Sequence, residues 1–289
     1  MPEKILITGA TGFLGDHLAR ALAGRGRQIL AAVRSPFPHA RPWTVVHLDL
    51  RDPASLAAAT AEHPSLIVHA AAVATLAQCE RDPAAALQVN ALAAETLAAR
   101  AHALGSAFVL ISTDQVFDGE RGQYRESDRP GPVNAYGRTK LEGEERVQRA
   151  HRRALIVRLP LMFGPSATGD RGASDALHAL VQRGAAPALF TDEFRSPVDV
   201  RDAARGIAVL VAQRRTGLLH LGGPERLSRF ALGLLVARHF GFAAEIIRAA
   251  RSADHAGPRR PRDVSLDSAR ARALLGWLPR SPVAALTPR

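Results

Sequence analysis

The sequence contains few cysteine, lysine and aromatic residues, and each shortage limits what the protein can be. The single cysteine, Cys79, excludes an internal disulfide framework and is typical of proteins in a reducing compartment. Aromatic residues make up only 5% of the 289 residues, so the core must be built mainly from alanine, leucine and valine. Hydrophobic residues still reach 47%, enough to bury a sizeable core. The length fits one large α/β domain with a smaller appendage, or two modest domains.

Long apolar runs are also missing from the sequence. The longest apolar stretch, residues 66–77, is interrupted by His69 and is far shorter than the roughly 20 residues that a membrane span needs. Residues 1–4 lead directly into an apolar strand and lack the basic leader and apolar stretch of a signal peptide. We therefore expect a soluble, cytoplasmic protein that binds no membrane.

The charge of the chain is strongly one-sided, with a formal net charge of +11. Of the 38 basic residues only Lys4 and Lys140 are lysines, and the arginines are spread along the expected helices rather than grouped in one block. This spread argues against a nucleic-acid-binding surface. We expect the excess charge to attract an anionic small molecule such as a nucleotide.

Apolar, β-rich runs alternate with Ala/Leu-rich stretches, which predicts a parallel sheet covered by helices on both faces. The expected strands are 5–8, 29–33, 44–48, 66–70, 108–112 and 155–159, and the expected helices are 14–23, 55–61, 83–104 and 136–149. Asp52, followed by proline, predicts a helix start, and Gly105 predicts a helix end. We expect an α/β, Rossmann-like doubly wound nucleotide domain over 1–160, with a strand near 218–221 as a candidate to rejoin its sheet. The remainder, 161–289, would form a smaller C-terminal substrate-binding lobe.

Three glycines directly follow the first expected strand, in the run Gly9-Ala-Thr-Gly12-Phe-Leu-Gly15. Glycines at a strand–helix turn let the backbone approach a pyrophosphate, whose charge is met by the helix N-terminus. An ordinary tight turn is the alternative, but the strand before and the helix after favour a dinucleotide site. The predicted cofactor-binding set takes Thr11, Phe13 and Leu14 from this loop in addition to its glycines.

The second expected strand ends in Arg34 and Ser35, where folds that prefer NAD place an acid on the ribose. A carboxylate would repel a 2′-phosphate, whereas Arg34 can bind it through a charge-assisted fork and Ser35 can add a hydroxyl. The alternative is that Arg34 is one more surface arginine. Asp49 and Leu50, past the third strand, are predicted to meet the adenine, with loop capping as the alternative for Asp49. The sequence thus predicts NADP(H) as cofactor.

Tyr136 and Lys140 lie four residues apart on an expected helix, so both side chains share one face. An ammonium close to a phenol favours the phenolate and makes tyrosine a usable proton shuttle near neutral pH. Thr113 leaves the fifth expected strand at the carboxyl edge of the sheet, where it can hydrogen-bond a substrate oxygen. We predict Thr113, Tyr136 and Lys140 as the catalytic residues.

Composition strengthens this assignment. The chain has only two tyrosines and two lysines, yet one tyrosine and one lysine stand four residues apart. Where arginine replaces lysine almost everywhere, a lysine at 140 indicates chemistry that needs a compact ammonium. The alternative is that Tyr136 and Lys140 have a purely structural role.

The histidines, such as His69, His178, His220 and His239, do not follow the sequence spacing of metal ligands. We therefore assign them structural roles and predict no metal site.

The chain resembles the dTDP-4-dehydrorhamnose reductase group of extended short-chain dehydrogenases. The residues that carry the resemblance are the loop Gly9–Gly15, the run Ser-Thr113-Asp-Gln-Val-Phe-Asp-Gly, the run Tyr136-Gly-Arg-Thr-Lys140-Leu-Glu-Gly-Glu, the segment Arg195-Ser-Pro-Val-Asp-Val-Arg-Asp, Leu221-Gly-Gly and the tail Arg260-Pro-Arg-Asp-Val-Ser-Leu-Asp.

The resemblance implies that Tyr136 donates a proton while NADPH delivers hydride to the 4-keto carbon of a nucleotide sugar, as in dTDP-rhamnose biosynthesis. It further implies that Lys140 binds the nicotinamide ribose and that Thr113 orients the carbonyl. The positions that it adds to the predicted cofactor site are Ala70, Ala71, Ala72, Asn90, Pro160 and Leu161. Related dimers pair the helices that correspond to 83–104 and 136–149, so a homodimer is one expectation; an alanine-rich face packed within one chain is the alternative.

The sequence departs from the family pattern at two places. Gln115 stands where the family usually has an aromatic residue, and Leu76-Ala77 stand in place of a Val-Asp pair. Both departures fall in stretches that the family uses near its substrate. Two other functions therefore stay open: a reductase of another ketone on the same site, and a non-catalytic NADP-binding regulator resembling the regulatory subunit of methionine adenosyltransferase.

Overall fold

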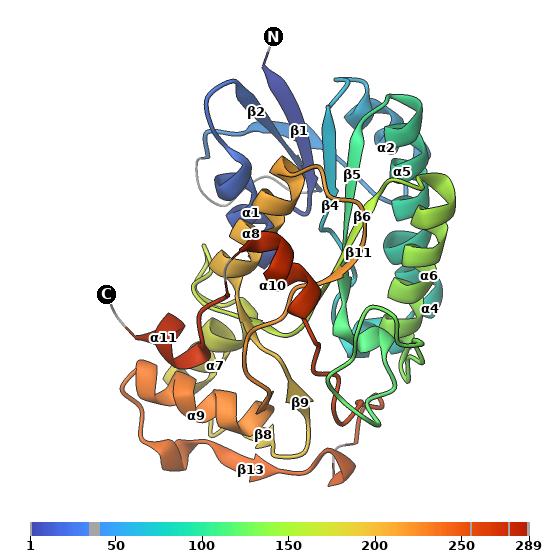
Figure 1. Ribbon diagram of the computed structural model, residues 1–289. Helices are drawn as coiled ribbons and strands as arrows, with labels where there is room; N and C mark the ends of the chain where they lie inside the picture. The colour runs from blue at the N-terminus through green and yellow to red at the C-terminus, as the bar shows by residue number, and fades with distance from the viewer. Residues whose placement is uncertain (1, 35–40, 255, 277, 288–289) are drawn as a thin grey trace. The chain divides into compact units, whose positions relative to one another are not determined.

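The computed structural model describes residues 2–34, 41–254, 256–276 and 278–287, so Ser35 lies outside the described residues. Seven strands form one sheet in the order β11-β6-β5-β4-β1-β2-β3 (Figure 1). They are β1 Glu3–Thr8, β2 Arg27–Val33, β3 Thr44–His47, β4 Leu66–His69, β5 Ala107–Thr113, β6 Leu155–Leu159 and β11 Gly217–His220. The pairs β1–β2, β1–β4, β2–β3 and β4–β5 are parallel. The strand order reverses between β1 and β4, and in open α/β sheets ligands bind beside such a reversal.

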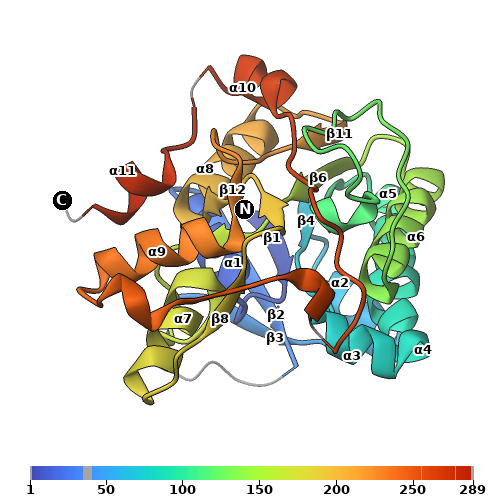
Figure 2. The same cartoon turned by 90° about the horizontal axis from the view of Figure 1, so that it is seen from below.

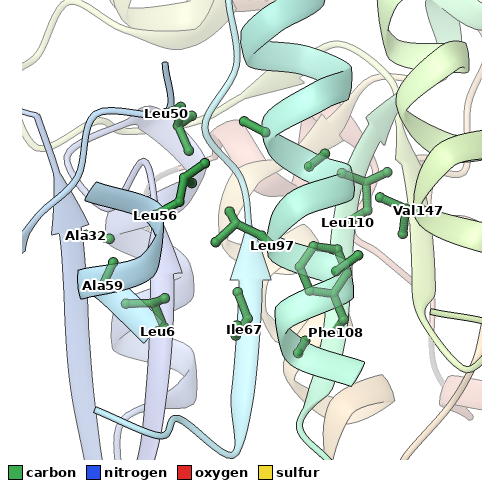
Figure 3. Packing of buried hydrophobic residues seen from close by; sticks show 14 of the residues in the cluster. Leu6, Ala32, Leu50, Leu56, Ala59, Ile67, Leu97, Phe108, Leu110 and Val147 are labelled. Carbon is green, nitrogen blue, oxygen red and sulfur yellow. The ribbon is translucent and has the colours of Figure 1, made fainter. Parts of the chain in front are cut away.

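Helices cover both faces of the sheet, which confirms the predicted doubly wound fold. α1 Phe13–Leu22 lies on one face, and α2 Pro53–Thr60, α5 Ala93–Ala103 and α6 Ala135–Ala150 lie on the other (Figure 1, Figure 2). Figure 3 shows the core under these three helices, where Leu97 and Phe108 pack between Ile67 and Leu110. The alanines on the inner face of α5 are fully buried in this core, so that face packs within the chain.

Local signals placed most helix ends correctly. The Asp52 side chain accepts a hydrogen bond from the backbone N–H of Ala54, with proline at the first position of α2. Gly105, with a φ of +67°, follows the end of α5. These two contacts confirm the predicted start of α2 and the predicted end of α5.

The helix expected over 83–104 is present, but it contains a π-helical turn that the sequence analysis did not predict. α4 Pro83–Leu87 leads into a π-helical turn, Gln88–Leu92, before α5 begins. Two tertiary contacts explain the turn. The Asn90 side chain bonds the backbone of Val73, and a Cβ on Gly143 of α6 would lie only 2.4 Å from the Asn90 carbonyl oxygen. The widened turn therefore lies where Asn90 bonds Val73 and where Gly143 of α6 approaches its backbone closely.

The chain divides into two compact units. Unit 1 comprises residues 1–112, 135–157 and 207–218, and unit 2 comprises residues 113–134, 158–206 and 219–289. α3 Leu76–Arg81 belongs to unit 1, and α8 Val200–Ala212 contributes to both. Unit 2 holds three small two-stranded sheets: β7 Met162–Phe163 with β10 Val198–Asp199, β8 Ala188–Phe190 with β13 Arg248–Ala250, and β9 Phe194–Arg195 with β12 Leu227–Ser228.

Unit 2 has its own apolar core. Its helices are α7 Gly172–Gln182, α9 Arg229–His239, α10 Ala269–Leu275 and α11 Pro282–Leu286, and its short 3₁₀ turns are Asp114–Val116, Ala244–Ile246 and Ser252–Asp254. Phe163, Leu177 and Val236 belong to this core, in which α9 contacts both α7 and α11. Figure 2 shows the three helices. Over the described part of the chain, no helix combines the length and apolar character required to cross a membrane.

Candidate active site

The glycine loop lies at the carboxyl end of β1, beside the reversal in strand order. Gly9 has a φ of +68°, and a Cβ there would lie 2.9 Å from the backbone of Ala71. The Gly12 N–H donates to the Gly9 carbonyl oxygen at 2.8 Å, and α1 begins one residue later. A Cβ on Gly15 would lie 2.1 Å from that same oxygen. The loop is therefore closed tightly onto itself, and only glycine fits at these positions.

The Ala70–Ala72 segment follows β4 and lies against the glycine loop. The Ala71 N–H donates to the Thr8 hydroxyl oxygen at 3.1 Å, and the same hydroxyl forms a hydrogen bond with His69 Nδ1 at 2.8 Å. Burial, and secondarily the charge of Lys140, lowers the pKa of His69 to about 3, so the ring is neutral at physiological pH.

Asn90 connects this segment to the helix that carries Tyr136. Its side chain accepts from the Val73 N–H at 2.9 Å and donates to the Val73 carbonyl at 3.1 Å and to the Thr139 hydroxyl at 3.0 Å. The Thr139 hydroxyl in turn donates to the carbonyl of Tyr136. Asn90 is fully buried, and these contacts give it a supporting role behind the site.

Arg34 and Asp49 lie at the carboxyl ends of the neighbouring strands β2 and β3. Arg34 is exposed. Asp49 accepts from the Arg51 backbone N–H at 2.9 Å and from its guanidinium at 2.7 Å. These bonds, and more weakly the charge of Arg34, hold the pKa of Asp49 well below its usual range. The carboxylate thus caps its own loop, the alternative left open above, while Leu50 beside it is buried.

A carboxylate that the sequence analysis missed lies in the first turn of α1. Asp16 is buried and accepts from Arg41 Nε and Arg20 Nε, each at 2.8 Å. These bonds help to lower the pKa of Asp16 against the opposing effect of burial, which is the largest single influence. The bond to Asp16 holds the Arg41 guanidinium at the first turn of α1, next to the glycine loop. A sequence signal exists only in part: the acid follows Gly15 directly, but its partner is 25 residues away.

Tyr136 and Lys140 lie in the first two turns of α6, in the same unit as the glycine loop. The helix start is fixed by Glu80, which accepts from the Ala135 N–H at 2.7 Å. Lys140 is 2% exposed, and its Nζ donates to the Ile111 carbonyl oxygen at 2.7 Å. Ile111 precedes Thr113 by two residues on β5. Tyr136 is half-buried.

Lys140 has a buried acidic neighbour that the sequence analysis did not single out. Glu144 follows it by one helical turn and accepts a hydrogen bond from the Ser112 hydroxyl of β5. Burial lowers the pKa of Lys140 to about 8, while Glu144 and then Cys79 act in the opposite direction. The i, i+4 spacing from Lys140 to Glu144 was the available signal, since such residues share a helix face.

Thr113 ends β5 and is the first residue of unit 2. Its hydroxyl accepts from the Gln115 N–H and donates to Asp114 Oδ1, each at 3.2 Å. Asp114 Oδ2 lies 3.3 Å from Arg195 Nε, and both side chains are buried. Burial raises the pKa of Asp114 to about 6, although Arg195 opposes the shift.

Arg195 is enclosed by chain partners. Besides Asp114, it donates to Glu193 at 2.9 Å and to the Phe194 carbonyl at 2.8 Å. It therefore holds the turn after Thr113 in place, and its donors are not available to an anionic substrate. Two of these partners, Glu193 and Phe194, precede Arg195 directly in the sequence, and only Asp114 comes from a distant segment. Pro160, also in unit 2, is buried after β6, and Leu161 packs against the apolar core of that unit.

Among the described residues, no group of three or more His, Cys, Asp and Glu side chains is arranged to hold a metal ion. Cys79 is buried, donates to the Val73 carbonyl, and has a pKa raised to about 11, chiefly by burial. Its thiol is therefore inert at neutral pH.

The low pKa of Lys140 predicts a specific pH dependence of stability without cofactor. In the unfolded chain a lysine titrates near 10.4, whereas in the folded protein it loses its proton from about pH 8. Between these values the unfolded state binds more protons, so the free energy of unfolding rises with pH, by at most about 3 kcal/mol. Urea unfolding at pH 7.5 and 10 would measure this rise. Lys140→Met should abolish it; an unchanged rise in that variant would assign it to other groups.

Three comparisons connect this geometry to known proteins. A family model described as the RmlD substrate binding domain matches residues 3–287. Methionine adenosyltransferase 2 subunit beta of Bos taurus is 32% identical over 279 residues, 94% of this chain and 82% of that protein. The probable low-salt glycan biosynthesis reductase Agl14 of Haloferax volcanii is 30% identical over 277 residues, 93% of this chain and 91% of that protein. The crystal structure of dTDP-4-dehydrorhamnose reductase from Bacillus anthracis in complex with NADP superposes with a TM-score of 0.88 at 24% identity, covering 99% of this chain and 98% of that one.

Proposed function

Because the chain belongs to the RmlD substrate-binding domain family, we propose that it is an NADP(H)-dependent reductase of a keto group on a nucleotide sugar. The observation that carries the proposal is the Tyr136–Lys140 pair, with the Lys140 ammonium buried against β5 at the same sheet edge as the glycine loop. A buried lysine without a catalytic task is rare, because desolvating an ammonium is costly.

The chain's residues fit a dinucleotide. A Cβ at Gly9, Gly12 or Gly15 would collide with backbone, which leaves the loop surface for close approach by a pyrophosphate. The N-terminus of α1 lies behind this loop and favours a negative charge. Arg34 is exposed at the end of β2, where a 2′-phosphate would lie, and Arg41 is held nearby by Asp16.

In the proposed reaction NADPH, when bound, supplies hydride to the carbonyl carbon. The Tyr136 hydroxyl donates its proton to the carbonyl oxygen, and the Thr113 hydroxyl hydrogen-bonds that oxygen and orients it. The Lys140 ammonium stabilises the tyrosinate that remains, and we propose that it also binds the nicotinamide ribose. Asn90 connects the segment after β4 to helix α6 through its bonds to Val73 and Thr139.

The nucleotide-sugar class is supported by charge and by relatives. The segment Arg259–Arg262 carries three arginines, of which Arg259 and Arg262 are exposed, and these can bind a diphosphate. One relative is a reductase of glycan biosynthesis, and one structural match is a reductase of dTDP-4-dehydrorhamnose. We propose a 4-keto nucleotide sugar as substrate in a cytoplasmic protein, with dehydrorhamnose as the first compound to test. A homodimer through α5 and α6 remains a proposal.

A second candidate function is favoured by the similarity to methionine adenosyltransferase 2 subunit beta: a regulatory subunit that binds NADP without turning it over. The test is NADPH absorbance loss with 4-keto nucleotide sugars, the free keto sugars and simple ketones. Binding energy from the nucleotide should position the reacting carbon, so the free sugars should lose turnover as well as affinity. Activity on simple ketones alone would leave a reductase of another class. Tight NADPH binding without oxidation of any member would support the regulator.

Arg34→Asp should reverse cofactor preference. The wild type should bind NADPH more tightly than NADH, because Arg34 pairs with the 2′-phosphate, and the new carboxylate should repel that group and accept from the 2′-hydroxyl of NADH. We expect the ratio of the Kd for NADPH to the Kd for NADH to change by about 10²-fold or more, because a charge-assisted hydrogen bond is replaced by repulsion between like charges. The matched control is Arg25→Asp, an equally exposed arginine before β2. Equal affinity of the wild type for both cofactors would remove Arg34 from the site.

A further inference from the structure

Glu144 lies on the buried face of α6, one helical turn after Lys140. Glu144 is 5% exposed and Lys140 is 2% exposed. Acids and lysines are almost never buried to this extent unless other groups pair with them. Residues four apart are neighbours on a helix surface, with about 5–6 Å between their Cβ atoms. Glu144 therefore places a negative charge beside the buried lysine.

The end of β5 holds both side chains. Lys140 Nζ donates to the Ile111 carbonyl oxygen at 2.7 Å, and the hydroxyl of the next residue, Ser112, donates to Glu144 Oε1. A hydrogen bond donated to a carboxylate favours its charged form. Two consecutive residues of one strand thus fix the ammonium and the carboxylate, immediately before Thr113.

The other ionisable groups packed around the ammonium are neutral at physiological pH. Burial keeps the pKa of His69 on β4 at about 3, so its ring carries no charge. Burial raises the pKa of Cys79 on α3 to about 11, so its thiol stays protonated. The phenol of Tyr136 is neutral until it gives up its proton. Residues 83–92, which pack on α6 as α4 and the π-helical turn, contain no ionisable side chain.

The remaining acids of the helices near the ammonium are engaged elsewhere. Glu80 of α3 bonds the first residue of α6, and Glu95 of α5 and Glu142 of α6 both bond Arg146. Glu144 opposes the effect of burial on the pKa of the ammonium more strongly than any other group does. Its carboxylate therefore offsets part of the cost of burying the charged lysine.

We propose that Glu144 is a positioning residue that holds the Lys140 ammonium in its protonated form at the site of proton transfer. The inference rests on the proposed function, since only a charged Lys140 stabilises the tyrosinate that Tyr136 leaves behind. Burial favours the neutral amine, and a carboxylate one helical turn away opposes that loss of the proton. Glu144 acts on the reaction through Lys140.

The small number of lysines makes a direct test practical. The chain contains only Lys4 and Lys140, so lysine labelled with ¹³C at Cε gives two NMR signals, and Lys4→Arg assigns them. Glu144→Gln keeps the shape of the side chain and removes its charge. The midpoint of the Lys140 titration should then move to lower pH by about 1–2 pH units, as expected for a unit charge roughly 6 Å away at an effective dielectric constant of about 20. An unmoved midpoint would overturn the proposal.

Two control variants separate the charge of Glu144 from its structural contacts. Glu142→Gln makes the same chemical change two residues away, where the carboxylate bonds Arg146, and should leave the Lys140 titration unchanged. Ser112→Ala removes the hydrogen bond to Glu144 but keeps the carboxylate, so the midpoint should move less than in Glu144→Gln. A displacement in either control as large as that in Glu144→Gln would contradict a direct effect of the Glu144 charge.

The pH profile of the reductase tests the consequence for turnover. The kcat/KM for a 4-keto nucleotide sugar should fall at alkaline pH as Lys140 loses its proton, and in Glu144→Gln this fall should begin at lower pH. We expect values within about twofold of the wild type at pH 6 and a loss of about tenfold at pH 8. A displaced titration with an unchanged pH profile would refute the role in turnover. If the wild type reduces no ketone, the proposed function fails, and the Lys140 titration measured with NADP present then decides the role of Glu144.

Discussion

Tyr136→Phe is expected to leave NADPH binding almost intact and to lower turnover by about 10²–10⁴-fold, the usual contribution of a positioned general acid. The substitution removes one oxygen atom, keeps the ring in its half-buried place on α6, and leaves Lys140 bonded to the Ile111 carbonyl. The loss should appear equally in kcat and kcat/KM, because the proton moves only in the transition state. Single-turnover NADPH oxidation would separate this chemical step from product release.

The chain supplies its own control, since Tyr124 is its other tyrosine. The Tyr124 hydroxyl donates to Asp118 and accepts from the Arg121 N–H, and the ring stacks on Phe117. Tyr124→Phe should therefore destabilise the protein by about 1–3 kcal/mol, because Asp118 loses its donor, without a direct effect on turnover. A Tyr136→Phe protein that reduced its substrate at the wild-type rate would show that another acid donates the proton.

The regular part of the fold could be predicted because its signals are local. The strands of the sheet read as short apolar runs, and the caps Asp52 and Gly105 act on their own helix ends. The π-helical turn could not be predicted, because it depends on where Gly143 of a later helix meets Asn90. The hydrophobic periodicity of residues 83–104 does not indicate that contact.

The site divides in the same way. The Tyr136–Lys140 spacing and the glycine loop follow from local geometry, so the sequence indicates them directly. Burial of Lys140 and the ion pair of Asp16 with Arg41 depend on pairing across the sheet edge. The enclosure of Arg195 by Glu193 and the Phe194 carbonyl is likewise something that a count of arginines cannot show. Net charge therefore does not identify which arginines would bind an anionic ligand.

Gly15→Ala should lower the affinity for NADPH by roughly 10–100-fold. Alanine in the first turn of a helix ordinarily stabilises it by up to about 1 kcal/mol relative to glycine. Here the added methyl would lie 2.1 Å from the Gly9 carbonyl oxygen and 2.9 Å from the Ala10 Cα. Backbone on both sides must move by about 1 Å to restore contact distance, at a cost of about 1–3 kcal/mol for overpacking. A pyrophosphate that needs the original loop shape loses a corresponding factor in Kd.

Gly24→Ala is the matched control, because the same methyl at this position has no atom within 4 Å. Both variants are to be titrated with NADPH by fluorescence and melted without cofactor. We expect Gly24→Ala to bind like the wild type and to melt at the same temperature or slightly higher. In Gly15→Ala the loss of affinity should exceed what the fall in Tm explains, since the displaced atoms are those that would face the pyrophosphate. Wild-type affinity in Gly15→Ala would mean that the cofactor does not bind over this loop.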